Sequence, residues 1–130
     1  MRYFLRLLLL TLAAVSMAPF AAGANGFTYA ILTKNESGNR AWITIQDLGK
    51  TRNLDYGWVD ANSSRPWRTG GYLRGSYYFV RFEFMDKSGK RVCDTRGQTL
   101  IGAVGNDGVG SAVAGRYDPK TGKCYIQHLY

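Results

Sequence analysis

Apolar and polar residues alternate with a period of two along much of the chain beyond residue 27, which is the spacing of half-buried β-strands. The clearest run is Ser76–Asp86, whose inward face would carry Tyr78, Val80, Phe82 and Phe84. We expect the other face of this strand to be half exposed to solvent. A turn at 87–90 and a partner strand at 91–96 complete a predicted hairpin over Tyr77–Arg96.

Further runs rich in β-branched and aromatic residues lie at 27–33, 40–46, 54–59 and 124–129. Clusters of Gly, Asn, Asp and Ser separate them, and no segment carries capped apolar residues at helical spacing. The pattern predicts an all-β fold, a small antiparallel β-sandwich or barrel of about six to eight short strands. Residues 60–66 have the composition of a turn, and residues 67–75 have no clear assignment.

A Gly/Ala/Val stretch at 102–115 has two interpretations. It is either a flexible loop or a strand whose glycines permit close packing. It lacks the Gly-Lys-Ser/Thr ending of a phosphate-binding loop and has a single acidic residue, so it predicts neither a phosphate nor a calcium site.

The first 24 residues have the layout of a secretory signal peptide. Arg2 and Arg6 precede the apolar run Leu7–Val15, and the small residues 21–24 follow. This run is too short for a membrane-spanning helix, which needs about 20 apolar residues. We expect a helical signal peptide cleaved after Ala24, and a single domain over 25–130 in the periplasm or outside the cell.

The chain is basic, with 17 Lys and Arg against 9 Asp and Glu and a formal charge of +8. Loss of Arg2 and Arg6 with the signal peptide leaves a charge of +6. This sign favours an anionic polymer, a lipid head group or an acidic protein as partner. The basic residues are scattered, so they equally fit a surface that only confers solubility. The sequence carries no DNA-binding motif and does not indicate an oligomeric state.

The two cysteines, Cys93 and Cys124, are predicted to form a structural disulfide, since an exported protein meets an oxidising compartment. Their separation does not resemble the Cys-x-x-Cys of a redox pair. In the chain-entropy model such a bridge stabilises the fold by about 3.7 kcal/mol. It would tie the segment around Cys93 to the last strand.

The residues that catalysis or metal binding would need are sparse. His128 is the single histidine, and no nearby sequence places a nucleophile beside it. Two carboxylate pairs depend on register: Glu83 with Asp94 across the hairpin, and Asp55 with Asp60. We therefore expect a protein that is not an enzyme and that holds neither a metal nor a cofactor.

An aromatic and basic stretch is the strongest candidate for a binding site. Trp58 lies just before it, and its predicted partner contacts are Arg65, Trp67, Arg68, Tyr72 and Arg74. Aromatic faces stack on sugar rings or bases, and guanidinium groups bind phosphate or carboxylate. The alternative is that both tryptophans pack in the core. Of the two, Trp67 is expected to be the more exposed, because it lies between two arginines.

Three functions fit these features. The leading hypothesis is an exported, non-enzymatic binding domain with a basic, aromatic surface for an anionic partner. The second is an inhibitor of a secreted hydrolase, using 60–75 or 102–115 as a protruding loop. The third is a membrane-surface binder with exposed aromatic side chains.

Overall fold

A computed structural model describes residues 28–102 and 108–130. This part of the chain forms eight strands: β1 (Thr28–Asn35), β2 (Ala41–Asp47), β3 (Asn53–Val59), β4 (Ser63–Leu73), β5 (Tyr77–Met85), β6 (Arg91–Leu100), β7 (Val109–Asp118) and β8 (Lys123–His128). None of the described residues belongs to a helix long and apolar enough to cross a membrane. The predicted signal peptide lies outside the described residues.

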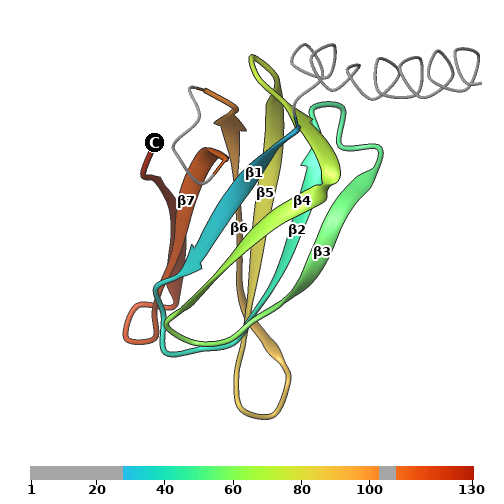
Figure 1. The fold of residues 1–130 in the computed structure, drawn as a ribbon. Helices are drawn as coiled ribbons and strands as arrows, with labels where there is room; N and C mark the ends of the chain where they lie inside the picture. Colours follow the sequence, from blue (N-terminus) through green and yellow to red (C-terminus); the bar gives the residue numbers. More distant parts are fainter. Residues whose placement is uncertain (1–27, 103–107) are drawn as a thin grey trace, which may run out of the picture.

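The strands form two sheets packed face to face (Figure 1). Sheet A has the order β4-β1-β7-β8, and sheet B has the order β3-β2-β5-β6. The prediction of an all-β fold is confirmed, and of the two predicted forms, sandwich and barrel, the structure is the sandwich. The expectation of a purely antiparallel arrangement is wrong for one pair. β1 and β7 are parallel, with Leu32 opposite Ala112. Between β1 and β7 the chain contributes four strands to sheet B and β4 to sheet A. The pattern of neighbouring residues cannot predict a pairing between strands so far apart in the sequence.

The predicted hairpin is confirmed as β5 and β6, which pair from Tyr77 opposite Leu100 onward. Val80, Phe82 and Phe84 are fully buried, as the alternation requires. The partner strand continues past Arg96 to Leu100. The core is the layer between the sheets, built from these residues and from Ile31, Ala41, Ile43, Ile45, Val59, Trp67, Tyr72, Ile101 and Val113.

The glycine-rich stretch contributes a strand. From Val109 to Gly115, β7 is buried throughout, whereas 103–107 lie outside the described residues. The close approach of β7 to Phe82 requires a glycine at position 115, because a Cβ there would lie only 2.3 Å from Cδ2 of Phe82. Since β4 and β7 are strands, neither 63–73 nor 109–115 is the protruding loop expected for an inhibitor.

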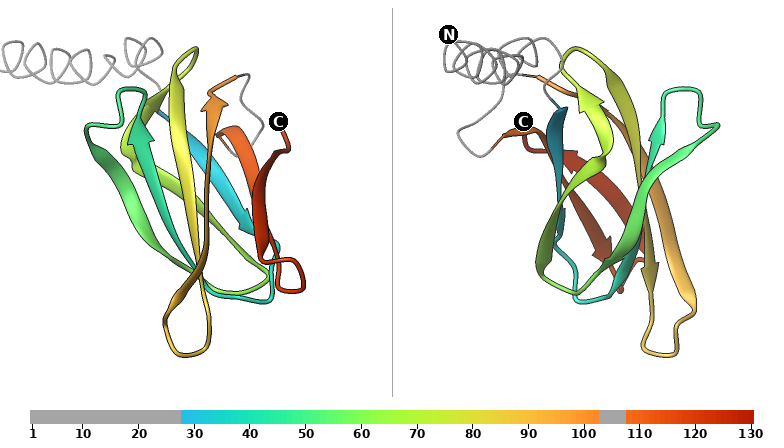
Figure 2. Two further views of the ribbon diagram at one scale, coloured as in Figure 1. Left: turned by 180° about the vertical axis from the view of Figure 1, so that it is seen from behind. Right: turned by 45° about the vertical axis from the view of Figure 1, so that its right-hand side comes forward.

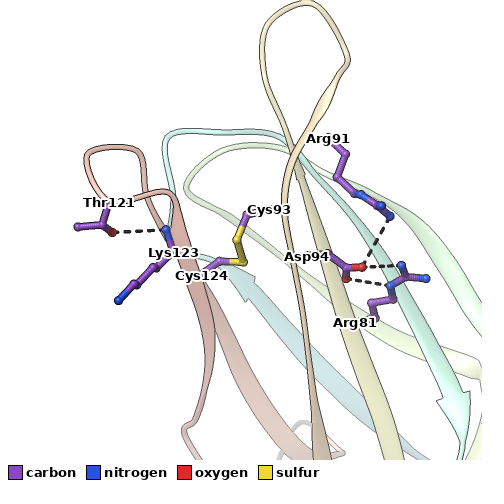
Figure 3. Close-up of a disulfide and its surroundings, with 7 residues drawn as sticks. All are labelled: Arg81, Arg91, Cys93, Asp94, Thr121, Lys123 and Cys124. Carbon is purple, nitrogen blue, oxygen red and sulfur yellow. Dashed lines mark hydrogen bonds and ion pairs between the residues drawn. A yellow bond between two sulfur atoms is a disulfide. The ribbon is translucent and has the colours of Figure 1, made fainter.

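Figure 2 shows the sandwich from behind and turned by 45°. Its two sheets are joined along both of their open sides. On one side, the predicted disulfide is confirmed: Cys93 of β6 and Cys124 of β8 are bonded, with their Cα atoms 6.2 Å apart (Figure 3). On the other side, the carboxylate of Asp55 on β3 accepts hydrogen bonds from the Tyr72 hydroxyl and the Gly70 N–H of β4. A covalent staple and a buried polar cluster therefore close opposite sides of the sandwich.

Candidate functional site

Two of the five predicted contact residues lie in the core. Trp67 is 3% exposed and Tyr72 is fully buried, so the expectation of an exposed Trp67 is wrong. The Trp67 indole N–H donates to the Thr33 hydroxyl at 2.8 Å. Residues five apart would point to opposite faces of a regular strand, but β4 has an irregularity here, and Gly71 has a φ of 70°. This bulge turns both aromatic rings inward.

The three predicted arginines do not form one patch. The Arg65 guanidinium lies 4.1 Å from the centre of the Trp67 ring, and it donates to the Trp58 carbonyl at 3.3 Å. Arg65 therefore bridges β4 to β3. Arg68 is exposed within β4, and Arg74 is exposed in the turn after that strand. Arg65 and Arg74 lie toward opposite ends of β4.

An exposed aromatic cluster lies instead on the outer face of sheet B. It consists of Trp42 on β2 with Tyr56 and Trp58 on β3. The Trp42 ring centre is 5.0 Å from that of Trp58, edge to face, and 5.8 Å from that of Tyr56. Tyr56 is 60% exposed and Trp58 is 38% exposed. The alternation of β2 and β3 places these rings outward, and the register of the two strands, which sets Trp42 opposite Trp58, brings the rings together.

Arg40 extends this cluster to form what we call the aromatic–arginine surface: Arg40, Trp42, Tyr56 and Trp58. The Arg40 guanidinium carbon lies 4.2 Å from the Trp58 ring centre, within cation–π distance. Its Nε also lies 3.3 Å from the carboxylate of Asp60. Arg40 therefore already holds both a ring and a carboxylate.

A shallow pocket of about 430 Å³ opens beside Arg40 and Trp58. Its far wall is the turn between β5 and β6, where Asp86 accepts hydrogen bonds from the backbone N–H groups of Ser88 and Lys90, both at 2.9 Å. A further bond from the Ser88 hydroxyl, together with these, lowers the pKa of Asp86. The turn is thus held in one conformation. The lining residues are Gly38, Asn39, Arg40, Trp58, Met85, Asp86, Lys87 and Gly89.

An ionic network lies beside the aromatic cluster on the same face. Arg81 donates two hydrogen bonds to Asp94, of 2.9 and 2.6 Å (Figure 3). Arg91 donates to Glu83 at 3.0 Å. The register, which the sequence left open, sets Glu83 opposite Asp94. The hydrogen bond from Arg81 lowers the pKa of Asp94, so this carboxylate is ionised at neutral pH. The network is a scaffold of paired charges next to the exposed rings.

The second pair of carboxylates that the sequence allowed, Asp55 with Asp60, does not form one site. Asp55 is buried and bonded to Tyr72, whereas Asp60 is exposed and paired with Arg40. His128 bonds through Nε2 to the carbonyl of Gln98, which joins β8 to β6. Within residues 28–102 and 108–130, no group of three or more His, Cys, Asp or Glu side chains is placed to hold a metal ion.

No known family model matches this chain, and no curated protein matches it. Among solved structures, the chain is similar to one described as the NMR structure of the protein from Eubacterium rectale. The two share 15% identity, with a TM-score of 0.44, over 82% of this chain and 91% of that chain.

Proposed function

We propose that this protein is an exported, non-enzymatic binding domain for an anionic polymer, and that the aromatic–arginine surface makes the contact. An acidic polysaccharide suits the chemistry of this surface best. Flat rings stack on sugar rings, and a guanidinium binds carboxylate. The observation that carries the proposal is Arg40 stacked on the exposed Trp58 at the mouth of a pocket.

The surface is organised before any ligand arrives. Its aromatic side chains stand on two paired strands of a sheet, and ring contacts fix Trp42 against its two neighbours. Binding residues held in this way lose little conformational freedom when a ligand binds. Lys87 also lines the pocket and adds a second positive charge. The disulfide supports export, because such bonds persist in oxidising compartments.

The ion pair between Asp60 and Arg40 allows a further test of the proposed contact. The Asp60 carboxylate lies against Arg40, where the carboxylate of an acidic sugar would bind. The two would compete for one guanidinium. We expect Asp60→Asn to bind an acidic polysaccharide several-fold more tightly than the wild type, since an intramolecular competitor is removed.

Isothermal titration calorimetry with polygalacturonate, and with uncharged dextran as its neutral counterpart, tests the proposal. We expect binding to polygalacturonate that weakens as salt is added. Trp58→Ala should weaken it about tenfold or more, as expected for the loss of one stacking ring. Arg40→Ala should have a similar effect.

The matched controls are Tyr125→Ala, an exposed aromatic residue on β8, and Arg74→Ala, an exposed arginine at the other end of the molecule. Neither should change the affinity. Equal affinity of the wild type, Trp58→Ala and Arg40→Ala for polygalacturonate would show that the partner binds elsewhere.

A further inference from the structure

The end of the sandwich opposite the pocket carries four exposed apolar side chains, which we call the apolar rim. They are Leu48, Leu73, Tyr77 and Leu100, and each is between 43% and 53% exposed. In Figure 1 the β2–β3 loop, the β4–β5 turn and the end of β6 all lie at the end of the molecule where β1 begins. The pocket is at the other end, because β5 runs from Tyr77 at the rim to Met85 at the pocket.

The strand register makes the apolar rim continuous. Asp47 pairs with Tyr78, and Tyr77 pairs with Leu100. Leu48, Tyr77 and Leu100 therefore follow one another across the ends of β2, β5 and β6. Leu73 ends β4 at the same end of the molecule, and the turn from Leu73 to Tyr77 is closed by the Ser76 N–H, which donates to the Leu73 carbonyl at 3.2 Å. Single exposed apolar residues are ordinary, whereas a contiguous group marks an interaction surface.

The loops that present the rim are held by internal hydrogen bonds. The Asp47 carboxylate accepts the backbone N–H groups of Thr51 at 2.8 Å and Arg52 at 3.1 Å. In the β4–β5 turn, the Gly75 N–H donates to the Ile101 carbonyl at 2.8 Å. The exposure of Leu48 and Leu73 is therefore a property of the folded loops and does not arise from fraying.

Cations lie close in the chain to the two leucines at the ends of β2 and β4. Lys50 and Arg52 follow Leu48 in its loop, Arg74 follows Leu73, and all three are exposed. Lys50 Nζ lies 4.5 Å above the ring of Phe79, which is next to Tyr77 on the outer face of β5. The acidic side chain in these two loops is Asp47, and it is engaged by Thr51 and the loop backbone.

We propose that the apolar rim docks onto the surface of an anionic lipid bilayer. The four apolar side chains enter the interfacial region, and Lys50, Arg52 and Arg74 contact lipid phosphates. This site lies apart from the aromatic–arginine surface, and the inference does not depend on the proposed function. Neither apolar insertion nor charge alone gives stable attachment to a membrane, and the rim combines the two.

Vesicle co-sedimentation tests the proposal on the protein in the form that cells produce. The intact mass of each variant, measured by mass spectrometry, verifies that all variants have the same N-terminus. We expect binding to vesicles of phosphatidylcholine with phosphatidylglycerol and little binding to phosphatidylcholine alone. Lys50→Glu with Arg74→Glu should weaken binding about tenfold or more. Leu48→Ser with Leu100→Ser should weaken it comparably. The control, Lys120→Glu with Lys123→Glu, makes the same charge change at the other end and should bind as the wild type does.

A second measurement reports insertion directly. Leu48→Trp places an indole on the apolar rim, and its emission should shift to shorter wavelength when anionic vesicles are added. The proposal is overturned if this shift is absent, or if the control pair loses as much binding as the rim pairs. Trp58→Ala should leave vesicle binding unchanged while weakening polygalacturonate binding, so failure of one proposal is distinguishable from failure of the other.

Discussion

At the residue scale, the most constrained polar contact is the one between Asp55 and Tyr72. Both side chains are buried, and the carboxylate accepts hydrogen bonds from the tyrosine hydroxyl and from the Gly70 N–H. Burial and the bond to Asp55 raise the pKa of Tyr72 far above its usual value, so the hydroxyl stays protonated and donates. This donor is what compensates the carboxylate for leaving water.

We expect Tyr72→Phe to destabilise the protein by about 1–3 kcal/mol, because it removes one of the hydrogen-bond donors to the buried Asp55 carboxylate. Urea denaturation measures the loss. Asp55→Asn and the double variant complete a mutant cycle, and the effects should be strongly non-additive. Simple additivity would mean that the two side chains do not depend on one another.

The two hydrogen bonds from Arg81 to Asp94 predict that the stability of the fold depends on pH in a specific way. Arg81 lowers the pKa of Asp94 below its unfolded-state value of about 3.9. A depressed carboxyl pKa stabilises the fold at neutral pH, and this contribution is lost as the pH falls through the folded-state pKa. Asp94→Asn should therefore cost up to about 1 kcal/mol at pH 7, as for a well-formed surface pair. Urea midpoints should show the gap from the wild type closing below about pH 4. A gap that is constant with pH would contradict this origin.

At the element scale, strand alternation identified most of the fold in advance. The hairpin of β5 and β6 and its buried face follow from alternation and one turn, both of which are local. The bulge in β4 does not. Trp67 and Tyr72 face the core together only because β4 carries extra residues opposite β1, and these fall in residues 67–75, for which alternation gives no assignment. Alternation also could not predict the aromatic cluster, because the cluster depends on how two strands pair.

The close approach of β7 to β5 predicts that Gly115→Ala is destabilising. Its Cβ would lie 2.3 to 2.7 Å from three atoms of the Phe82 ring, which is fully buried in the core. Overpacking of this kind costs about 1–3 kcal/mol. Gly38→Ala is the matched control, because a Cβ there meets nothing within 4 Å. Thermal unfolding of the two variants decides, and equal melting temperatures would contradict the packing.

The disulfide acts on a pair of elements, because it joins the edge strand of one sheet to that of the other. We expect Cys93→Ser with Cys124→Ser to lose about 2–5 kcal/mol, as is typical of small secreted domains. The loss should appear as a lower midpoint in guanidinium denaturation. Addition of reductant should lower the wild-type midpoint toward that of the variant and leave the variant unchanged. A wild-type midpoint indifferent to reductant would contradict a stabilising role.

At the scale of the whole molecule, the sandwich separates two surfaces with different chemistry. The aromatic–arginine surface and its pocket lie beside the turn between β5 and β6, and the apolar rim lies at the other end of β5. Both surfaces carry cations, in keeping with the basic composition of the chain. The composition predicts an anionic partner but does not indicate which basic residues would contact it. The fold places Arg40 beside the exposed ring of Trp58.

The three tryptophans test in one NMR titration whether the outer face of sheet B contacts an acidic polymer, as we propose. The indole N–H signals of Trp42, Trp58 and Trp67 are followed as polygalacturonate is added. Trp42 and Trp58 lie on the proposed surface, whereas Trp67 is buried and bonded to Thr33. We expect the Trp42 and Trp58 signals to shift together and saturate while the Trp67 signal stays in place. Unmoved Trp42 and Trp58 signals in the presence of bound polymer would contradict the proposal.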